Sequence, residues 1–467
     1  MSSPPLPLPH LALIGAGITS LTLSLRLTSL GIPHTIYEQS PSLTELGAGL
    51  GFGPNAARAL EYIDPRLVEI FNQTATFVGT PSPQGKELLL QEGKAGDDKI
   101  WIEFLDGTKQ PEEGEELKPE FVIRAGNNKG HAAVHRGAWL DVLGGLVDTR
   151  ERVRFGKRVV DVVLPAGSKG RVKILLADGT EAEADGVVGC DGVKSKVRQV
   201  LMEALGEGRE KGKCGYSGKY AYRCLVPWGK AVEAVGEDRA GVSSLWMGPN
   251  RHLLTFPVDK QDEKFLNLVA FVTDESQVWP ERGPASLTLP ATKADALGDF
   301  EQAGFSDSVL QLLKVTNEKM DKWGLYDVAD RPLSKFYSGR IMVIGDAAHA
   351  STPHHGSGAG FCMEDIAVLG ALFEEAIARQ RLTVDALEDV FAAFDNQRRE
   401  RDQWLVNSSR RAADLYQWRI PEFLKPNSLE KMKADIEQRQ EFCWGFNVGA
   451  AVREAKKHMS ERLAAYK

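Results

Sequence analysis

The sequence predicts an α/β fold in which a parallel-sheet domain is interleaved with a mainly antiparallel β-sheet domain and is followed by a helical C-terminal region. Three observations predict it. The apolar run Leu11–Ile14 enters a glycine-rich turn, and an amphipathic stretch through about Leu30 follows, which is typical of a strand-turn-helix unit. Residues 216–325 hold several short apolar runs, which is typical of antiparallel strands. Apolar residues from Ile366 to Ile377 then recur at helical spacing, which predicts a long core helix.

The N-terminal turn has the pattern of a dinucleotide-binding site. Gly15 permits a tight turn, and Gly17 allows a pyrophosphate to approach the unpaired N–H groups at the start of the next helix. Ser20 stands where a third glycine is usual, and its small side chain still allows close packing of helix and strand. The following strand, His34–Tyr37, ends in Glu38, about 20 positions beyond the second glycine, where an acid binds ribose hydroxyls. A Rossmann-like domain is therefore predicted, and the acid argues against the 2′-phosphate of NADP at this position.

Two further motifs lie far downstream. The run Gly189-Cys190-Asp191-Gly192-Val193-Lys194-Ser195-Lys196-Val197-Arg198 follows a strand-like segment. Gly345-Asp346-Ala347-Ala348-His349 follows another, and Pro353 and Gly356-Ser357-Gly358-Ala359-Gly360 come after it. In this order and spacing the three motifs resemble the single-component, group A, FAD-dependent aromatic monooxygenases. This group includes para-hydroxybenzoate hydroxylase and salicylate hydroxylase. The resemblance covers about residues 10–400, and the form of the last glycine run is most similar to that of fungal-type members.

The resemblance implies a set of FAD-binding residues. Asp346 is expected at the ribityl or phosphate end of FAD, and Arg136 and the segment containing Gly49 and Asn55 are expected beside the flavin. Asp191 is expected to support the cofactor and the passage of the nicotinamide. The full expected cofactor-binding set is Gly15, Gly17, Ser20, Glu38, Gly49, Arg136, Asp191, Asp346, Pro353, Gly356, Gly358, Ala359 and Gly360.

The domain organisation implied by the resemblance divides the FAD-binding domain into two parts of the chain. After a flexible tail over residues 1–10, the first part spans 11–215 and includes a surface insertion at about 80–125. The antiparallel sheet of a substrate-binding domain spans 216–325, the second part of the FAD-binding domain spans 326–400, and C-terminal helices occupy 401–467.

The activity implied by the resemblance is hydroxylation of a phenolic aromatic substrate by O₂, with NADPH or NADH as reductant, through a flavin C4a-hydroperoxide. Arg223 is expected to hold a phenolate or carboxylate or to steady the flavin as it moves, the alternative being a surface arginine paired with an acid. His354 or His355, with a pKa near neutrality, is expected to accept the phenol proton, the alternative being a solvated loop. His349 is interpreted as a structural hydrogen-bonding residue.

Three other functions remain open on the same scaffold. A dearomatising, ring-contracting or epoxidising flavin monooxygenase of secondary metabolism is chemically close. A flavin-dependent halogenase would share the first turn, but its Trp-x-Trp-x-Ile-Pro motif is absent from this sequence. A flavin-binding regulatory protein without turnover would retain the same binding motifs.

Composition supports an enzyme with a small-molecule substrate. The 467 residues are 42% hydrophobic with a net charge of −7, and the absence of a basic stripe argues against nucleic-acid binding. The five cysteines lack metal-ligand spacing, which favours reduced thiols, a cytoplasmic location and no metal site. No apolar run is long enough for a membrane span.

The C-terminal helices are expected to be charged, and a homodimer is compatible with them. A cluster of arginines near their start is interpreted as a solvated or interface helix face; its members are Arg398, Arg399, Arg401, Arg410 and Arg411.

Overall fold

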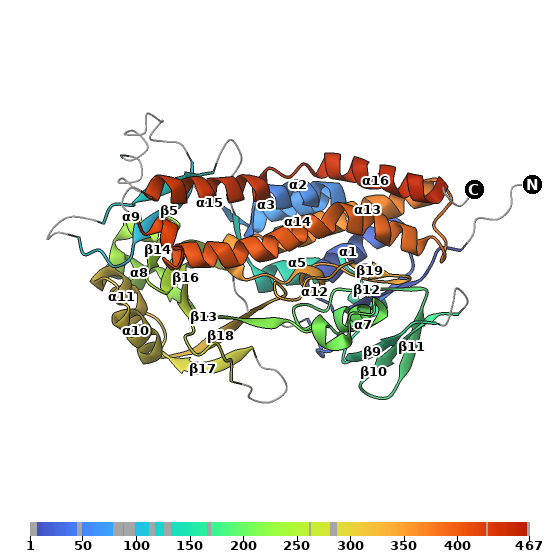
Figure 1. Ribbon diagram of the computed structural model, residues 1–467, viewed down its shortest axis with the longest axis horizontal. Helices are drawn as coiled ribbons and strands as arrows, with labels where there is room; N and C mark the ends of the chain where they lie inside the picture. Colours follow the sequence, from blue (N-terminus) through green and yellow to red (C-terminus); the bar gives the residue numbers. More distant parts are fainter. Residues whose placement is uncertain are drawn as a thin grey trace, which may run out of the picture.

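The computed structural model describes residues 7–43, 49–77, 87, 99–111, 117–125, 132–165, 170–260, 263–280, 287–425 and 428–464. A parallel sheet with its helices forms one end of the elongated molecule, and a large antiparallel sheet forms the other (Figure 1). Long C-terminal helices connect the two ends. The predicted fold class is confirmed.

The sheet of the first domain has six strands in the order β19-β20-β12-β1-β2-β8. Its strands are β1 (Leu11–Ile14), β2 (His34–Tyr37), β8 (Val153–Arg154), β12 (Gly186–Gly189), β19 (Tyr337–Ser338) and β20 (Ile341–Val343). All neighbours pair in parallel except β19 and β20. Both faces of β1 and β12 are buried, which explains their uninterrupted apolar sequences. Because β1, β12 and β20 are adjacent and parallel, the three sequence motifs that follow them all lie at one edge of the sheet.

Helices cover this sheet and form the largest apolar core with it. They include α1 (Ile18–Ser29), α2 (Pro54–Ile63), α3 (Pro65–Thr74), α5 (Arg136–Leu146), α7 (Lys196–Ala204) and α13 (Gly358–Ala378). Helix α13 is the long core helix predicted from its apolar spacing, and it is buried along most of its length. Shorter helical segments are α6 (Thr149–Arg152), η1 (Arg209–Gly212), α12 (Asp346–His349) and η2 (Pro353–His355).

Two three-stranded sheets complete this half. One contains β3 (Gly49–Phe52), β4 (Thr76–Phe77) and β7 (Ala132–His135). The other contains β9 (Val159–Val163), β10 (Val172–Leu176) and β11 (Glu181–Ala184). Strands β10 and β11 pair antiparallel and form a hairpin across the turn at Asp178 and Gly179.

The second domain is an eight-stranded sheet in the order β17-β18-β13-β16-β15-β14-β5-β6. Its strands are β5 (Ile100–Asp106), β6 (Phe121–Arg124), β13 (Gly215–Pro227), β14 (Ser244–Gly248), β15 (Arg251–Lys260), β16 (Glu263–Thr273), β17 (Thr288–Thr292) and β18 (Lys319–Asp327). Its pairs are antiparallel except β14 with β5. One face packs against α8 (Trp228–Val235), α10 (Lys293–Gln302) and α11 (Asp307–Lys314), with α9 (Glu237–Ala240) beside them.

The expected surface insertion at about 80–125 needs a correction. Its described strands β5 and β6 are largely buried and extend the eight-stranded sheet at one edge. The glycine- and glutamate-rich sequence around them suggested a surface loop, but the strands themselves are apolar enough to join the sheet. Most of residues 78–98 and all of 112–116 lie outside the described residues.

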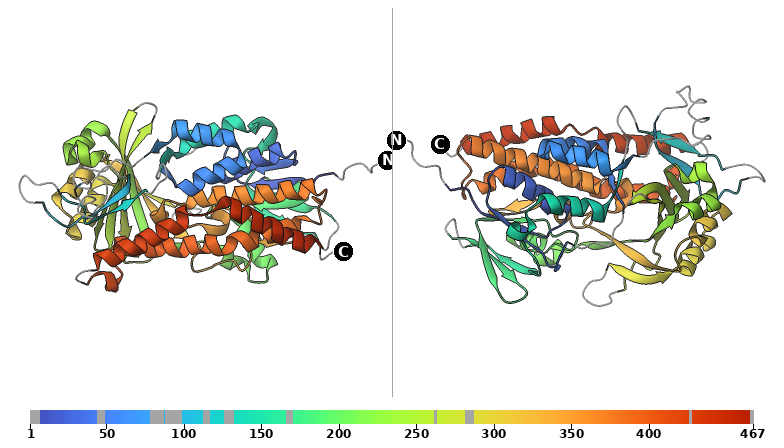
Figure 2. Two further views of the ribbon diagram at one scale, coloured as in Figure 1. Left: turned by 90° about the horizontal axis from the view of Figure 1, so that it is seen from above. Right: turned by 180° about the vertical axis from the view of Figure 1, so that it is seen from behind.

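The C-terminal helices bridge the two domains. Helix α14 (Leu387–Tyr416) runs through the expected boundary at residue 400 without a break. After η3 (Pro421–Phe423), α15 (Leu429–Trp444) and α16 (Val448–Ala464) lie along the same side of the molecule, as both views of Figure 2 show. In the described part of the chain, no helix is long and apolar enough to cross a membrane.

Candidate active site

The turn after β1 packs against the turn after β12. Gly15 has a φ of +93°, and a Cβ at this position would lie 2.9 Å from the carbonyl oxygen of Cys190. Only glycine fits this left-handed, closely packed position without strain. Gly345, after β20, also has a positive φ, and a Cβ there would lie 2.9 Å from Oγ1 of Thr19. The three motifs therefore form one continuous surface.

The start of α1 is suited to a phosphate. Gly17 precedes the helix without a side-chain cap, and a Cβ built on it would meet no atom within 4 Å. The N–H groups of the first turn are thus open to an anion. Glu38 lies beside this turn, where its carboxylate accepts hydrogen bonds of 2.7 Å from the N–H groups of Ala16 and Ser40. Ser20 is fully buried in α1, as its proposed packing role requires.

Asp191 lies next to the glycine turn, but its carboxylate caps a helix. Its oxygens accept hydrogen bonds from Oγ of Ser195 and from the N–H groups of Lys196 and Val197, at the start of α7. These bonds fix the loop between β12 and α7. The last residue of the same motif, Arg198, is fully buried and donates a 3.0 Å hydrogen bond to the carbonyl oxygen of Ala348, which ties the second motif to the third.

Asp346 is the one exposed residue in the run from Ile341 to Ala350. Its carboxylate is therefore accessible at the edge where the motifs meet. Arg136, at the start of α5, lies close enough to Asp346 for the carboxylate to raise the arginine pKa, although burial has the larger, opposite effect. An anion-binding backbone, an exposed acid and an enclosed guanidinium are thus grouped at one place.

The loop after α12 leads to the start of α13. Pro353 begins η2, and Gly356 ends it in the left-handed conformation. Gly358 begins α13 without a side-chain cap and with open space around it, and Ala359 packs against the main core. Gly360 allows close approach by Asn55, because a Cβ there would lie 3.1 Å from the amide nitrogen of that residue.

Gly49 connects this loop region to the second domain. A Cβ on Gly49 would lie 3.4 Å from the ring of Phe256 in β15. The neighbouring Gly47 and Ala48, which belong to the same expected flavin segment, lie outside the described residues.

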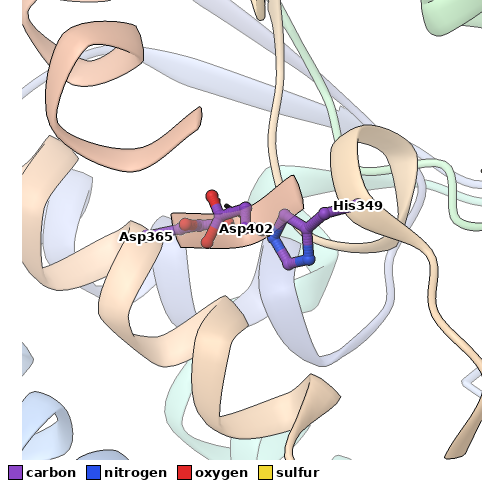
Figure 3. Close-up of side chains that lie close together, drawn as sticks. All are labelled: His349, Asp365 and Asp402. Atoms are coloured by element: carbon purple, nitrogen blue, oxygen red, sulfur yellow. Dashed lines mark hydrogen bonds and ion pairs between the residues drawn. The ribbon is translucent and has the colours of Figure 1, made fainter. Parts of the chain in front are cut away.

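A buried ion network holds the Gly345–Asp346 turn in place. Asp365 of α13 accepts hydrogen bonds from the N–H of Gly345 (2.9 Å) and from Nε2 of His349 (2.8 Å). Figure 3 shows the side chains of His349, Asp365 and Asp402 close together, contributed by α12, α13 and α14. The structural role expected for His349 agrees with this geometry.

Arg398 of α14 supplies the positive charge at the centre of the network. Its guanidinium donates to Asp365 (2.8 Å) and Glu364 (2.6 Å) and also to Asp402, and all four side chains are fully buried. Arg401 adds a second bond to Glu364, at 2.8 Å. The interpretation of the arginine cluster as a solvated or interface face is therefore wrong for these two residues. His349, Asp365 and Asp402 have the composition of a metal site, but a guanidinium already provides their counter-charge.

The network shifts the pKa of its members. Burial alone would lower the pKa of His349, but the carboxylates of Asp402 and Asp365 raise it to about 9. Burial also raises the pKa of Asp402 well above its usual range, against the effect of Arg398. For Asp365, the charges of His349 and Arg398 outweigh burial and lower the pKa. His349 is consequently a cation at neutral pH, paired with Asp365.

A narrow cavity of about 60 Å³ lies between the inner face of the eight-stranded sheet and η2. It is lined by Trp101, Ile102, Phe104, Ser243, Leu245, His252, Leu254, Phe256, Phe271, Pro353, His354, His355, Gly356 and Tyr416. The lining is mostly aromatic and aliphatic. The loop that carries the predicted flavin-contacting residues therefore also forms one wall of an apolar, ring-lined cavity.

The two histidines of η2 are buried, so the alternative of a solvated loop is wrong. The expected near-neutral pKa is also wrong, because burial lowers the pKa of His354 well below its usual value and that of His355 to about 4. His355 shares a 2.8 Å hydrogen bond between Nε2 and Oγ of Ser408. In the described structure, neither ring nitrogen of His354 has a hydrogen-bond partner.

Arg223 lies on β13, on the sheet face that carries the cavity, and is largely enclosed. It is paired across the sheet with Val269 and, through β16, with the cavity residue Leu254. Its guanidinium carbon lies 5.2 Å from the ring centre of Trp323, and within the described residues it has no carboxylate partner. The alternative of a surface arginine paired with an acid is therefore wrong. Burial and the charge of nearby Arg136 lower the pKa of Arg223 to about 10, so it is still a cation at neutral pH.

These features fit FAD. The uncapped start of α1 suits a pyrophosphate, and Glu38 lies at the position where an acid binds a ribose. The exposed Asp346 and the open space at Gly358 extend the same surface toward the cavity. Arg136 and Arg223 place positive charge beside this surface, as an anionic reduced flavin requires.

Comparisons with known proteins agree with this site. A sequence family described as an FAD binding domain matches residues 306–409. The FAD-dependent monooxygenase orf3 of Aspergillus niger is 35% identical to this chain, over 97% of the chain and 98% of its own length. The salicylate hydroxylase asL1 of Sarocladium schorii is 33% identical, over 97% and 92%. The solved structure of a salicylate hydroxylase substrate complex has a TM-score of 0.75 and 28% identity, over 96% of this chain and 98% of its own.

This chain therefore belongs to the salicylate hydroxylase-like FAD-dependent monooxygenases, and its cofactor is FAD. The expected family is confirmed.

Several residues that shape the site were not predicted. The buried network was missed for two reasons. The acids Glu364 and Asp365 lie in the largely apolar helix α13, and Arg398 lies in the strongly charged helix α14. No sequence spacing indicates that the two helices are in contact. A consecutive acid pair inside a buried helix was the one available signal, because buried acids require a partner. His252 of β15, which lines the cavity, gave no sequence signal at all.

Proposed function

We propose that this chain is an NAD(P)H- and FAD-dependent monooxygenase that hydroxylates a phenolic aromatic substrate in the cavity between the eight-stranded sheet and η2. The observation that carries the proposal is the position of that cavity. One wall is the FAD loop from Pro353 to Gly356, and the other is the aromatic and aliphatic face of the sheet. A flat, mostly apolar molecule that displaces the side chains narrowing this cavity would lie against the cofactor loop.

FAD, when bound and reduced, supplies the activation of O₂ and the transfer of one oxygen atom to the ring. The chain would hold it through the start of α1, Glu38, Arg136 and Asp346, as the geometry of these residues supports. The residues of the protein then have to orient the ring, stabilise its negative oxygen and exclude water.

Arg223 is the residue best suited to stabilise a phenolate. It is a cation in a largely enclosed position, and in the described structure no acid neutralises it. A phenolate makes the ring carbon beside it more nucleophilic, and an enclosed cation favours this ionised form. His354 has too low a pKa to hold a proton well at neutral pH, so its proposed part is to bind a substrate oxygen by a hydrogen bond.

The apolar side chains of the cavity would exclude water from the reacting oxygen. Leu245, Leu254, Phe256 and Phe271 present hydrocarbon to the cavity from β14, β15 and β16. The relative named salicylate hydroxylase supports an aromatic substrate for this chain.

The test is purification of the holoenzyme followed by assays of NADPH and NADH oxidation with a panel of phenols, together with product mass. We expect a phenol to stimulate oxidation and to gain one oxygen atom. Arg223→Met should keep its FAD and lose turnover by about 100-fold, as removal of one charge-stabilising group does. Arg171→Met is the matched control, because its side chain is 41% exposed and pairs with Asp185. A fully active Arg223→Met enzyme would remove Arg223 from the mechanism, and failure of every phenol to stimulate oxidation would refute the phenolic substrate.

A further inference from the structure

The turn between α15 and α16, residues 442–446, contacts two segments of the chain that are expected beside the flavin. These segments are the start of α2, at residues 53–55, and the start of α13, at residues 357–360. We infer that this C-terminal turn is a positioning element of the FAD site and that it acts through Arg401, Glu364 and Asn55. The inference goes beyond the proposed function, because it concerns the cofactor and is independent of the substrate.

The C-terminal turn contacts the start of α13 through Cys443 and Trp444. Both side chains pack in one buried cluster with Phe361, which lies in the first turn of α13. Burial raises the pKa of the Cys443 thiol to about 12, and a hydrogen bond with Ser357, the residue immediately before the helix, opposes this effect. The C-terminal turn therefore holds the loop that carries the expected flavin contacts.

The C-terminal turn contacts the start of α2 through Trp444 and two backbone carbonyl groups. Gly53 precedes α2, and a Cβ built on it would lie 2.6 Å from Nε1 of Trp444. Arg58, in the second turn of α2, donates hydrogen bonds to the carbonyl oxygen of Trp444 and to that of Phe446, the latter at 3.2 Å. In Figure 1, the helices on either side of the turn pass beside α2. The missing side chain at residue 53 thus leaves room for the indole, and Arg58 fixes the backbone that carries it.

Arg401 of α14 connects the C-terminal turn to α13. Its guanidinium donates hydrogen bonds to the carbonyl oxygens of Phe442 (2.8 Å) and Cys443 (3.0 Å), and to both carboxylate oxygens of Glu364 (2.8 and 2.9 Å). The guanidinium carbon lies 4.1 Å from the ring centre of Phe446, so an aromatic ring covers the charge. A planar group with five N–H donors makes all of these contacts at once.

Glu364 in turn fixes the side chain of Asn55. One of its oxygens accepts a hydrogen bond of 2.8 Å from the amide nitrogen of Asn55, which lies on α2. A carboxylate only accepts, so the amide must present its NH₂ group to Glu364 and its oxygen elsewhere. In the described structure that oxygen is buried and has no hydrogen-bond partner. A buried acceptor without a partner is costly, and FAD carries N–H and O–H groups that supply such a bond.

The start of α13 lies directly against the same amide. A Cβ built on Gly360 would lie 3.1 Å from the amide nitrogen of Asn55. Asn55 and Glu364 are 309 positions apart in the sequence, and the hydrogen bonds through Glu364 and Arg401 fix the two segments relative to each other. A cofactor that contacts both segments binds more tightly when their separation is set in advance. A purely structural network would stabilise the apoprotein without affecting FAD.

The experiment measures the dissociation constant of FAD for the apoprotein, from the change in flavin fluorescence, in parallel with urea denaturation. Arg401→Met removes the charge and all of its hydrogen bonds, and we expect it to weaken FAD binding by about 10-fold. Arg401→Lys keeps the charge but has three donors and no planar face, so we expect a smaller loss in the same direction. The measurement includes no substrate and no NAD(P)H, so its result does not depend on the proposed function.

Arg239→Met is the matched control. Arg239 is also buried and is paired with a buried acid, Glu103, but it lies on α9 in the second domain. Its loss should lower the free energy of unfolding of the apoprotein and leave the dissociation constant of FAD unchanged. The comparison separates positioning of the flavin from a general loss of stability.

A double-mutant cycle tests the route through Asn55. Asn55→Ala removes the amide oxygen and should weaken FAD binding by about 10-fold. Because Arg401 acts by orienting Asn55, Arg401→Met should have little further effect on FAD affinity when Asn55→Ala is already present.

Three results would overturn the inference. If Arg401→Met and Arg239→Met both lower the stability and both bind FAD as the wild type does, the network is purely structural. If Arg401→Met does not fold, wild-type FAD affinity in Arg401→Lys and in Asn55→Ala leads to the same conclusion. Losses of FAD affinity that add in the double variant would refute the route through Asn55.

Discussion

Replacing Asp365 with asparagine tests how the buried network supports the cofactor site. The change keeps the size of the side chain and removes its charge. In the native protein, one oxygen accepts from Gly345 and His349 at 2.9 and 2.8 Å, and the other accepts from Arg398 at 2.8 Å. An amide has only one oxygen, so its NH₂ group must face either Arg398 or the His349 and Gly345 donors. One set of hydrogen bonds becomes a contact between donors.

The magnitude follows from the burial of these groups. Asp365 and Arg398 are both fully buried, and breaking such a pair from one side costs about 3–5 kcal/mol. Glu364 and Asp402 still pair with Arg398 in the variant, so we expect the lower end, about 3 kcal/mol less free energy of unfolding. Because the Gly345–Asp346 turn loses its anchor, FAD should also bind more weakly.

The assay is urea denaturation of the apoprotein followed by tryptophan fluorescence, with FAD affinity measured separately by flavin fluorescence. The control is Glu181→Gln, which removes an exposed partner of Lys173 and should change the unfolding free energy by less than about 0.5 kcal/mol. If Asp365→Asn costs less than about 1 kcal/mol and binds FAD normally, the network does not hold the turn, and the reasoning is wrong.

Three further predictions follow from the same site. The pKa of His349 is about 9 in the folded protein, above its unfolded value of about 6.5. The charged imidazole therefore stabilises the folded protein by up to roughly 3 kcal/mol; this stabilisation is fully present below about pH 6.5 and is lost as the pH rises through 9. Denaturation between pH 6 and 10 should show this loss in the wild type and not in His349→Gln. Asp346→Ala should yield largely apo protein, while the stability of the apoprotein changes by less than about 0.5 kcal/mol because the side chain is exposed; normal flavin content would contradict its role. Gly15→Ala should cost about 1–3 kcal/mol through its positive φ and the contact with Cys190, and should lower FAD content; an unchanged melting temperature and FAD content would show that the turn tolerates a side chain.

Much of the fold was predictable from local sequence. The parallel strands of the first domain are short apolar runs that end at glycine turns, and the antiparallel strands are apolar runs of regular spacing. Both patterns arise within a few residues of chain, so composition and periodicity reveal them. Strands β5 and β6 were missed as sheet members because β14, the strand that pairs with β5 and so connects both to the sheet, lies more than 100 residues away in the sequence.

The residues expected to bind the cofactor have clearer sequence signals than the buried residues that support them. The roles expected of Gly15, Gly17 and Glu38 depend on backbone geometry and fixed spacing, which a sequence displays directly. Asp365 and Arg398 form an ion pair between α13 and α14, two helices whose contact cannot be inferred from the spacing of residues in the sequence. Both side chains are fully buried, whereas a charged residue in a helix is usually interpreted as exposed to solvent. The pKa of His354 depends on enclosure by β15 and α14, which a loop sequence cannot show.

Product analysis under ¹⁸O₂ tests the central claim most directly. The FAD-loaded protein is incubated with NAD(P)H, ¹⁸O₂ and the phenol that stimulates NAD(P)H oxidation most strongly, and the product is examined by mass spectrometry. Hydroxylation in the ring-lined cavity predicts one ¹⁸O atom in the product and an equivalent amount of NAD(P)H oxidised. Oxidation of NAD(P)H that yields only hydrogen peroxide, with this and every other phenol, would contradict the account.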